Sequence, residues 1–135
     1  MRLDGRSALV TSKTYNVRRR DPRYVASVPV TLHRFLPKGP LITRGLSLDV
    51  SVHGMAALVC SAPRVGETVV IALSLPGGPV EVLATVRHSS EARCGFEFFP
   101  LSGNVQQGIE DWIEELREQE ERLFPFSHAA AADRE

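Results

Sequence analysis

Residues 68–89, TVVIALSLPGGPVEVLATVRHS, give the clearest indication of the fold class. Both halves of the stretch are short runs rich in Val, Ile and Leu, a composition typical of β-strands. Between them, Pro76-Gly77-Gly78-Pro79 supplies residues that favour a tight turn. Two strands joined by so short a turn pair in antiparallel fashion. The stretch therefore predicts a β-hairpin and points to a fold made mainly of strands.

The same pattern continues on both sides of this hairpin. Further apolar runs of strand length occupy residues 25–35, 41–51, 54–60 and 92–99. Turn-forming residues at 37–40 and 63–66 separate several of them. Five or six antiparallel strands follow, and in a chain of 135 residues a small barrel is the most economical arrangement because closure removes exposed strand edges.

After Pro100 the apolar period changes from two to 3.6 residues, which predicts an amphipathic helix over about residues 102–123 with Ser102 as its N-cap. Its apolar stripe consists of Val105, Ile109, Trp112, Ile113, Leu116 and Leu123. We expect this stripe to pack against one end or side of the barrel. The alternative is a helix presented to a partner.

Length and composition favour a single domain at residues 18–124, between a flexible leader at residues 1–17 and a disordered tail at residues 125–135. The sequence has neither a membrane-spanning apolar stretch nor a secretion signal, so we expect a cytoplasmic protein without membrane insertion. Cys60 and Cys94 lack the spacing of a zinc site or a disulfide framework, and we expect both to be reduced and half-buried.

Charge is distributed unevenly although the net charge is zero. Residues 1–44 carry ten Lys and Arg against two acids, and residues 101–135 carry three against nine. The acidic end is interpreted mainly as a solvated helix face. At the basic end Arg18, Arg19, Arg20 and Arg23 repel one another unless an anion lies among them. This crowding indicates an anion-binding segment.

Residues 49–54, DVSVHG, form a second polar motif at the end of an expected strand. Strand alternation predicts that Asp49 and Ser51 project together while Val50 and Val52 point inward. A carboxylate accepts well from the two-donor edge of guanine, and a serine can donate or accept beside it. Gly54 suits either close approach of a planar base or a positive φ. The plain alternative is an ordinary Asx/Ser turn.

The arginines supply complementary chemistry, since forked guanidinium groups bind phosphate through paired hydrogen bonds. Arg19 and Arg23 lie at most about 13 Å apart along an extended chain, a reach suited to a small ligand. Guanine planes also stack on guanidinium groups. The earlier RxxxR at residues 2–6 is read as accidental, because only residues 19–23 run directly into a strand.

RxxxR at residues 19–23 followed by DxSxxG at residues 49–54 resembles the two-part signature of PilZ domains, bacterial receptors of cyclic di-GMP (c-di-GMP). The resemblance implies a six-stranded antiparallel β-barrel closed by a C-terminal helix. It further implies that Arg19 and Arg23 bind phosphate and stack on guanine, that Asp49 and Ser51 read a guanine edge, and that Gly54 allows close approach. Arg18 is similar to the basic residue that goes with capture of two intercalated ligand molecules.

The sequence thus favours a c-di-GMP receptor or adaptor whose ligand orders the leader and so signals to a protein partner. An enzyme is not expected, because GLSLD at residues 45–49 only approximates a nucleophile motif and lies on a strand. Neither a metal site nor another cofactor is expected. Two alternatives stay open: a module of the same fold that binds protein but no nucleotide, and a basic barrel for nucleic acid, which the lack of an aromatic ladder disfavours.

Overall fold

The computed structural model describes residues 21–124 of the chain. The expectations for the leader, the tail, Arg18 and Arg19 therefore fall outside the described residues. The elements are β1 (Tyr24–Val25), β2 (Pro29–Leu36), β3 (Gly39–Ser51), β4 (Gly54–Val59), β5 (Thr68–Leu75), β6 (Gly78–Ser89), β7 (Arg93–Phe98) and α3 (Gly103–Leu123).

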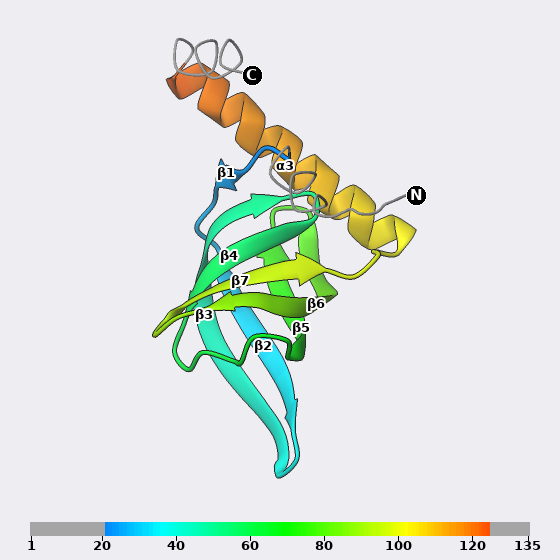
Figure 1. The fold of residues 1–135 in the computed structure, drawn as a ribbon. Helices are drawn as coiled ribbons and strands as arrows, with labels where there is room; N and C mark the ends of the chain where they lie inside the picture. The colour runs from blue at the N-terminus through cyan, green and yellow to red at the C-terminus, as the bar shows by residue number, and fades with distance from the viewer. Residues whose placement is uncertain (1–20, 125–135) are drawn as a thin grey trace, which may run out of the picture.

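Six strands form a closed antiparallel barrel (Figure 1). Going round the ring, the order of neighbours is β2, β3, β4, β7, β6 and β5, and β5 pairs with β2 again. The short β1 pairs with β3 outside this ring, with Tyr24 opposite Val50 and Val25 opposite Asp49. The prediction of a six-stranded barrel with a C-terminal helix is confirmed.

The expected hairpin at residues 68–89 is present, and β5 pairs along its whole length with β6, from Thr68↔Thr85 to Leu75↔Gly78. Gly78 has φ +127°, a conformation that side-chain-bearing residues rarely adopt. The Pro-Gly-Gly-Pro turn thus works as the sequence indicates.

The expected first strand at residues 25–35 is divided in two, which the sequence does not foretell. Ser47 is completely buried on β3, and its hydroxyl donates to the carbonyl of Ala26. The same hydroxyl accepts from the backbone N–H of Val28 at 2.9 Å. Because a side chain serves these backbone groups, the ladder is interrupted between β1 and β2.

The barrel interior is a continuous apolar core. Its most deeply buried side chains include Leu32, Val50, Met55, Val69, Ile71, Leu73, Val86 and Cys94. Both cysteines are free, but the expectation that both are half-buried is wrong: Cys94 is fully buried and Cys60 is exposed, because Cys60 lies just beyond the end of β4.

Helix α3 lies across one end of the barrel (Figure 1). Ser102 is its N-cap as predicted, although its side chain makes no capping hydrogen bond. Ile109 and Trp112 are buried in the core, and Val105, Ile113 and Leu116 pack against it. The exception to the expected stripe is Leu123, which is 70% exposed because the last turns extend past the strands. No helix within residues 21–124 has the length and apolarity needed to cross a membrane.

A buried ion pair joins β2 to the segment before β5. Arg34 donates from Nε to Glu67 Oε2 at 2.8 Å and from Nη2 to Oε1 at 3.1 Å. Burial raises the pKa of Glu67, but the hydrogen bonds from Arg34 and from the backbone N–H of Arg64 outweigh it, so the pKa lies below its ordinary value. Arg34 and Glu67 thereby hold two neighbouring strands together.

Candidate functional site

An ion pair connects the two polar motifs. Arg23 directly precedes β1, and Asp49 lies on β3 opposite Val25. Arg23 donates from Nη1 to Asp49 Oδ1 at 2.6 Å. The guanidinium side chain is 50% exposed and the carboxylate side chain 24% exposed. The pair therefore presents both a cationic fork and a carboxylate at the surface.

Asp49 owes its position to an irregularity in the ladder. The register between β3 and β4 shifts between Ser47 and Asp49, which is a β-bulge. Bulges change the direction of side chains and are common beside functional sites. Here the shift leaves Ser47 inside the barrel and brings the carboxylate of Asp49 to the half-exposed surface beside Arg23.

The expected alternation fails at the end of β3. Val50 is buried as predicted, but Ser51 is only 3% exposed and Val52 is exposed. The reason is that β3 ends at Ser51 and the chain turns at Val52 and His53. Ser51 Oγ donates to the Gly54 carbonyl and accepts from the His53 N–H, each at 3.3 Å. In this structure the Ser51 hydroxyl stabilises the turn.

The packing of β4 against β7 explains why position 54 is a glycine. Gly54 pairs with Glu97 of β7, and a Cβ built on Gly54 would lie 2.3 Å from the Phe96 carbonyl oxygen. The glycines of residues 21–124 with positive φ are Gly39, Gly66 and Gly78, so the expected positive φ is not the explanation for Gly54. Gly54 allows β4 and β7 to approach each other. Its contact with a ligand stays a prediction.

Around these residues the surface forms a hollow of about 170 Å³. Its lining consists of Asp21, Arg23, Ser51, His53, Gly54, Arg87, His88, Gly95, Phe96 and Glu97. His53 Nδ1 lies 2.5 Å from Asp21 Oδ2, so an N–H at that nitrogen donates to the carboxylate. Arg87 donates from Nε to Glu97 Oε1 at 2.6 Å. Both contacts fix side chains on the rim.

Of the six predicted ligand residues, Arg23, Ser51 and Gly54 line this hollow, and Asp49 lies beside it through its contact with Arg23. Arg18 and Arg19 lie outside the described residues. Further residues line the same hollow but were not predicted as ligand residues, among them Asp21, Arg87 and His88. Asp21 could have been found, since it lies inside RxxxR. Arg87 and His88 reach the site only through the pairing of β6 with β7, where a register shift occurs between Val86 and His88, and the sequence carries no signal for that.

The side chains in and beside the hollow are suited to hydrogen bonds with an anion. They offer guanidinium groups for an anion, a carboxylate for a two-donor edge and imidazole rings on the rim. Residues 21–124 contain no group of three or more His, Cys, Asp or Glu side chains able to hold a metal ion. The arrangement thus has the donors and acceptors needed to bind a small polar anion.

The fold is a closed six-stranded antiparallel barrel with a helix across one end, and it carries two polar motifs on one surface. The PilZ domain model matches residues 17–115, most of the chain, and the protein belongs to the PilZ domain family. PilZ domains are regulatory receptor domains rather than enzymes. No curated protein matches the chain at the required significance.

Several solved structures share the fold. The PilZ domain of Escherichia coli YcgR with c-di-GMP is 23% identical with a TM-score of 0.64, over 78% of this chain and 97% of that one. The YcgR–c-di-GMP complex is 26% identical with a TM-score of 0.64, over 78% of this chain and 49% of that one. The K. pneumonia MrkH–c-di-GMP complex is 18% identical with a TM-score of 0.59, over 78% of this chain and 55% of that one. The chain thus spans about half of the longer YcgR and MrkH chains.

Proposed function

We propose that this PilZ domain is a c-di-GMP receptor that holds the ligand between residues 19–23 and the barrel surface at residues 49–54. One observation carries the proposal: Arg23 and Asp49, one from each motif, contact each other at 2.6 Å on the same surface. The YcgR and MrkH structures that share this fold contain c-di-GMP. The hollow of about 170 Å³ is small for a cyclic dinucleotide, so the ligand lies largely across the open surface.

Each motif residue has a role in this proposal. Arg19 and Arg23 bind phosphate oxygens and stack on guanine, and Asp49 accepts from the two donors on a guanine edge. Ser51 contributes a hydrogen bond once the turn adjusts, because its hydroxyl already serves Gly54 and His53. Gly54 has no side chain and so allows the ligand to approach the barrel surface closely. Arg18 favours two intercalated ligand molecules over one.

Binding then acts as a signal. The ligand draws the arginine segment onto the barrel, and the leader at residues 1–17 becomes ordered across it as a new surface for a downstream protein. In this proposal the protein is an adaptor of the bacterial cytoplasm. It engages neither nucleic acid polymers nor the membrane interior.

Isothermal titration calorimetry tests the receptor role. c-di-GMP is titrated into the wild-type protein and into Arg19→Ala/Arg23→Ala, with Arg44→Ala as control because Arg44 is an exposed arginine on β3 away from the hollow. Saturable binding to wild type and control, lost in the double variant, supports the proposal, and the molar ratio reports on Arg18. A folded wild-type protein that binds no c-di-GMP would instead be an interaction module that is independent of nucleotide.

The ordering of the leader needs its own measurement. Amide hydrogen exchange of residues 10–24 is compared with and without saturating c-di-GMP. Slower exchange in the complex supports the switch, because ordered amides are protected. If c-di-GMP binds without any change in exchange, the proposed receptor role stands but the proposed ordering of the leader is wrong.

A further inference from the structure

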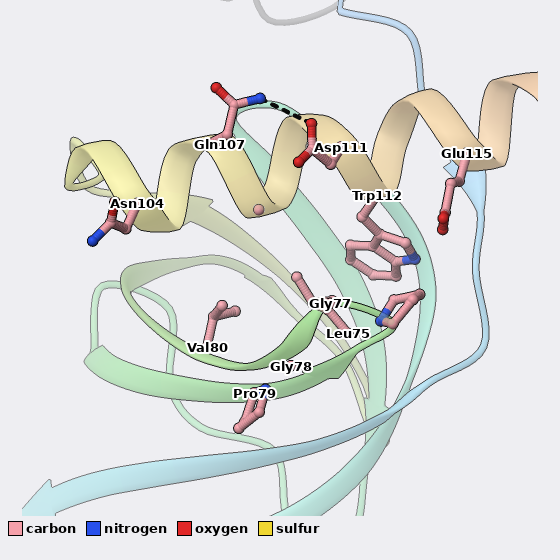
Figure 2. A pocket seen from close by; sticks show the side chains of 12 residues that line it. Leu75, Gly77, Gly78, Pro79, Val80, Asn104, Gln107, Asp111, Trp112 and Glu115 are labelled. Atoms are coloured by element: carbon pink, nitrogen blue, oxygen red, sulfur yellow. Dashed lines mark hydrogen bonds between the residues drawn. The ribbon is translucent and has the colours of Figure 1, made fainter.

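A second hollow, of about 450 Å³, lies between the β5–β6 hairpin and α3. Leu75, Val80 and Trp112 give it an apolar side, and Asn104, Gln107, Asp111 and Glu115 give it a polar one. Figure 2 shows Trp112 extending from α3 toward the hairpin. The hollow shares no lining residue with the c-di-GMP surface around His53. Its size is that of a site for a small ligand or a few peptide residues.

Trp112 brings a buried donor to this hollow. The residue is only 4% exposed and lines the hollow, and within residues 21–124 its indole N–H makes no hydrogen bond. Buried indole N–H groups usually have a hydrogen-bond partner, and leaving one without a partner is costly. An occupant that offers a carbonyl oxygen would satisfy this donor.

The charge of the rim is one-sided. Asp111 and Glu115 are four residues apart on α3 and so lie on the same side of the helix. Asp111 accepts from Gln107 Nε2 at 2.8 Å, a bond drawn in Figure 2. No Lys or Arg within residues 21–124 lines the hollow, and Glu115 has no ion pair in that range. The carboxylates of Asp111 and Glu115, beside the apolar side of the hollow, are suited to a cation that is carried on an apolar stem.

From these features we infer that the hollow binds an arginine-containing segment of a partner protein. The guanidinium lies between the carboxylates of Asp111 and Glu115, where its fork matches two acceptors. Its aliphatic stem packs on Trp112 and Val80. A backbone carbonyl of the same segment accepts from the indole N–H. This site is separate from the proposed receptor function and does not depend on it.

The test uses Trp112 itself as the reporter, because it is the single tryptophan of the chain. A capped eight-residue peptide of alternating arginine and leucine is titrated into the full chain at low salt, without nucleotide, while tryptophan emission is followed. A second titration uses the same peptide with glutamate in place of arginine. The expected result is a saturable emission change with the first peptide and none with the second.

Two variants form a matched pair. Glu115→Gln is expected to weaken the arginine peptide about 10-fold, the loss of one charge-assisted contact. Glu110→Gln is the control, since Glu110 is an exposed acid on α3, like Glu115, but lies outside this hollow. Circular dichroism checks that both variants are folded.

Three results would overturn the inference. One is no emission change with the arginine peptide in a folded protein. Another is equal weakening by Glu110→Gln and Glu115→Gln, which would indicate attraction to the acidic helix as a whole. A third is binding of N-acetylarginine amide as tightly as the peptide, which would assign the hollow to a small cation rather than to a protein segment.

Discussion

Arg23 donates to Asp49 across 2.6 Å, although the two residues are 26 positions apart in the chain. The contact joins the arginine motif to the motif between β3 and β4. Both partners are partly exposed, and exposed ion pairs contribute only about 0.2–1 kcal/mol to stability. A ligand that offers phosphate to the guanidinium and guanine donors to the carboxylate can therefore replace this contact at small cost.

Arg23→Ala and Asp49→Ala should each weaken c-di-GMP binding by about 10- to 100-fold, the range expected for one or two charge-assisted contacts. The free energy of unfolding should fall by no more than about 1 kcal/mol. Calorimetry and urea denaturation measure the two effects, with Arg44→Ala as the control for loss of a surface arginine. A large loss of stability in either variant would show that the pair is structural.

Gly54→Ala should destabilise the barrel by about 1–3 kcal/mol, because the added methyl group meets the backbone of Phe96 and β4 and β7 must separate. Gly77→Ala is a suitable control, since nothing lies within 4 Å of a Cβ at that position and its φ is not positive. Urea denaturation of both variants gives the comparison. Equal stability of the two would refute the close approach at Gly54.

Stability should fall in acid partly through Glu67. Its pKa in the folded protein is below the ordinary value of 4.5, so its contribution to stability is fully present above that value and is lost as the pH drops through the folded pKa. Glu67→Gln should therefore make the stability less dependent on pH below about 4.5. Glu91→Gln, at an exposed loop position, serves as control. Thermal melts from pH 3 to pH 7 measure the effect, and unchanged pH dependence in Glu67→Gln would contradict it.

Ile109→Ala should cost about 2–5 kcal/mol, because Ile109 is 1% exposed and anchors α3 in the core. Leu123→Ala, at a position that is 70% exposed on the same helix, should change stability by less than about 0.5 kcal/mol. Chemical denaturation distinguishes the two. Similar losses would mean that the last turns of α3 are packed in solution.

The barrel could be predicted from the sequence because the signals for its strands and turns are local. Alternating apolar runs and Pro-Gly turns specify each strand within the residues that form it, as between Leu75 and Gly78. The sequence could not predict the break at residues 26–28, because that depends on the Ser47 hydroxyl, about twenty residues away. Leu123 was misplaced for a similar reason: helical periodicity does not indicate where the barrel ends.

The site was predicted in part. The two motifs name Arg23 and Asp49, but alternation fails for Ser51 and Val52 because the strand ends there. Arg87 and His88 arrive through the register of β6 with β7, and the hollow at Trp112 through the packing of α3 on a hairpin. Such relationships between distant segments are set by the tertiary structure and leave no mark in any single stretch of sequence.

Strand β1 has only two residues, and Tyr24 within it is buried next to Arg23. So short a strand is expected to detach while the barrel stays closed, because few backbone bonds hold it. A ligand held by Arg23 would then bind only those molecules in which β1 is attached. Its apparent affinity would be the intrinsic affinity multiplied by the fraction of such molecules. Natural variation at Val25, which is 78% exposed, would change this fraction and with it the apparent affinity, and would leave the melting temperature almost unchanged.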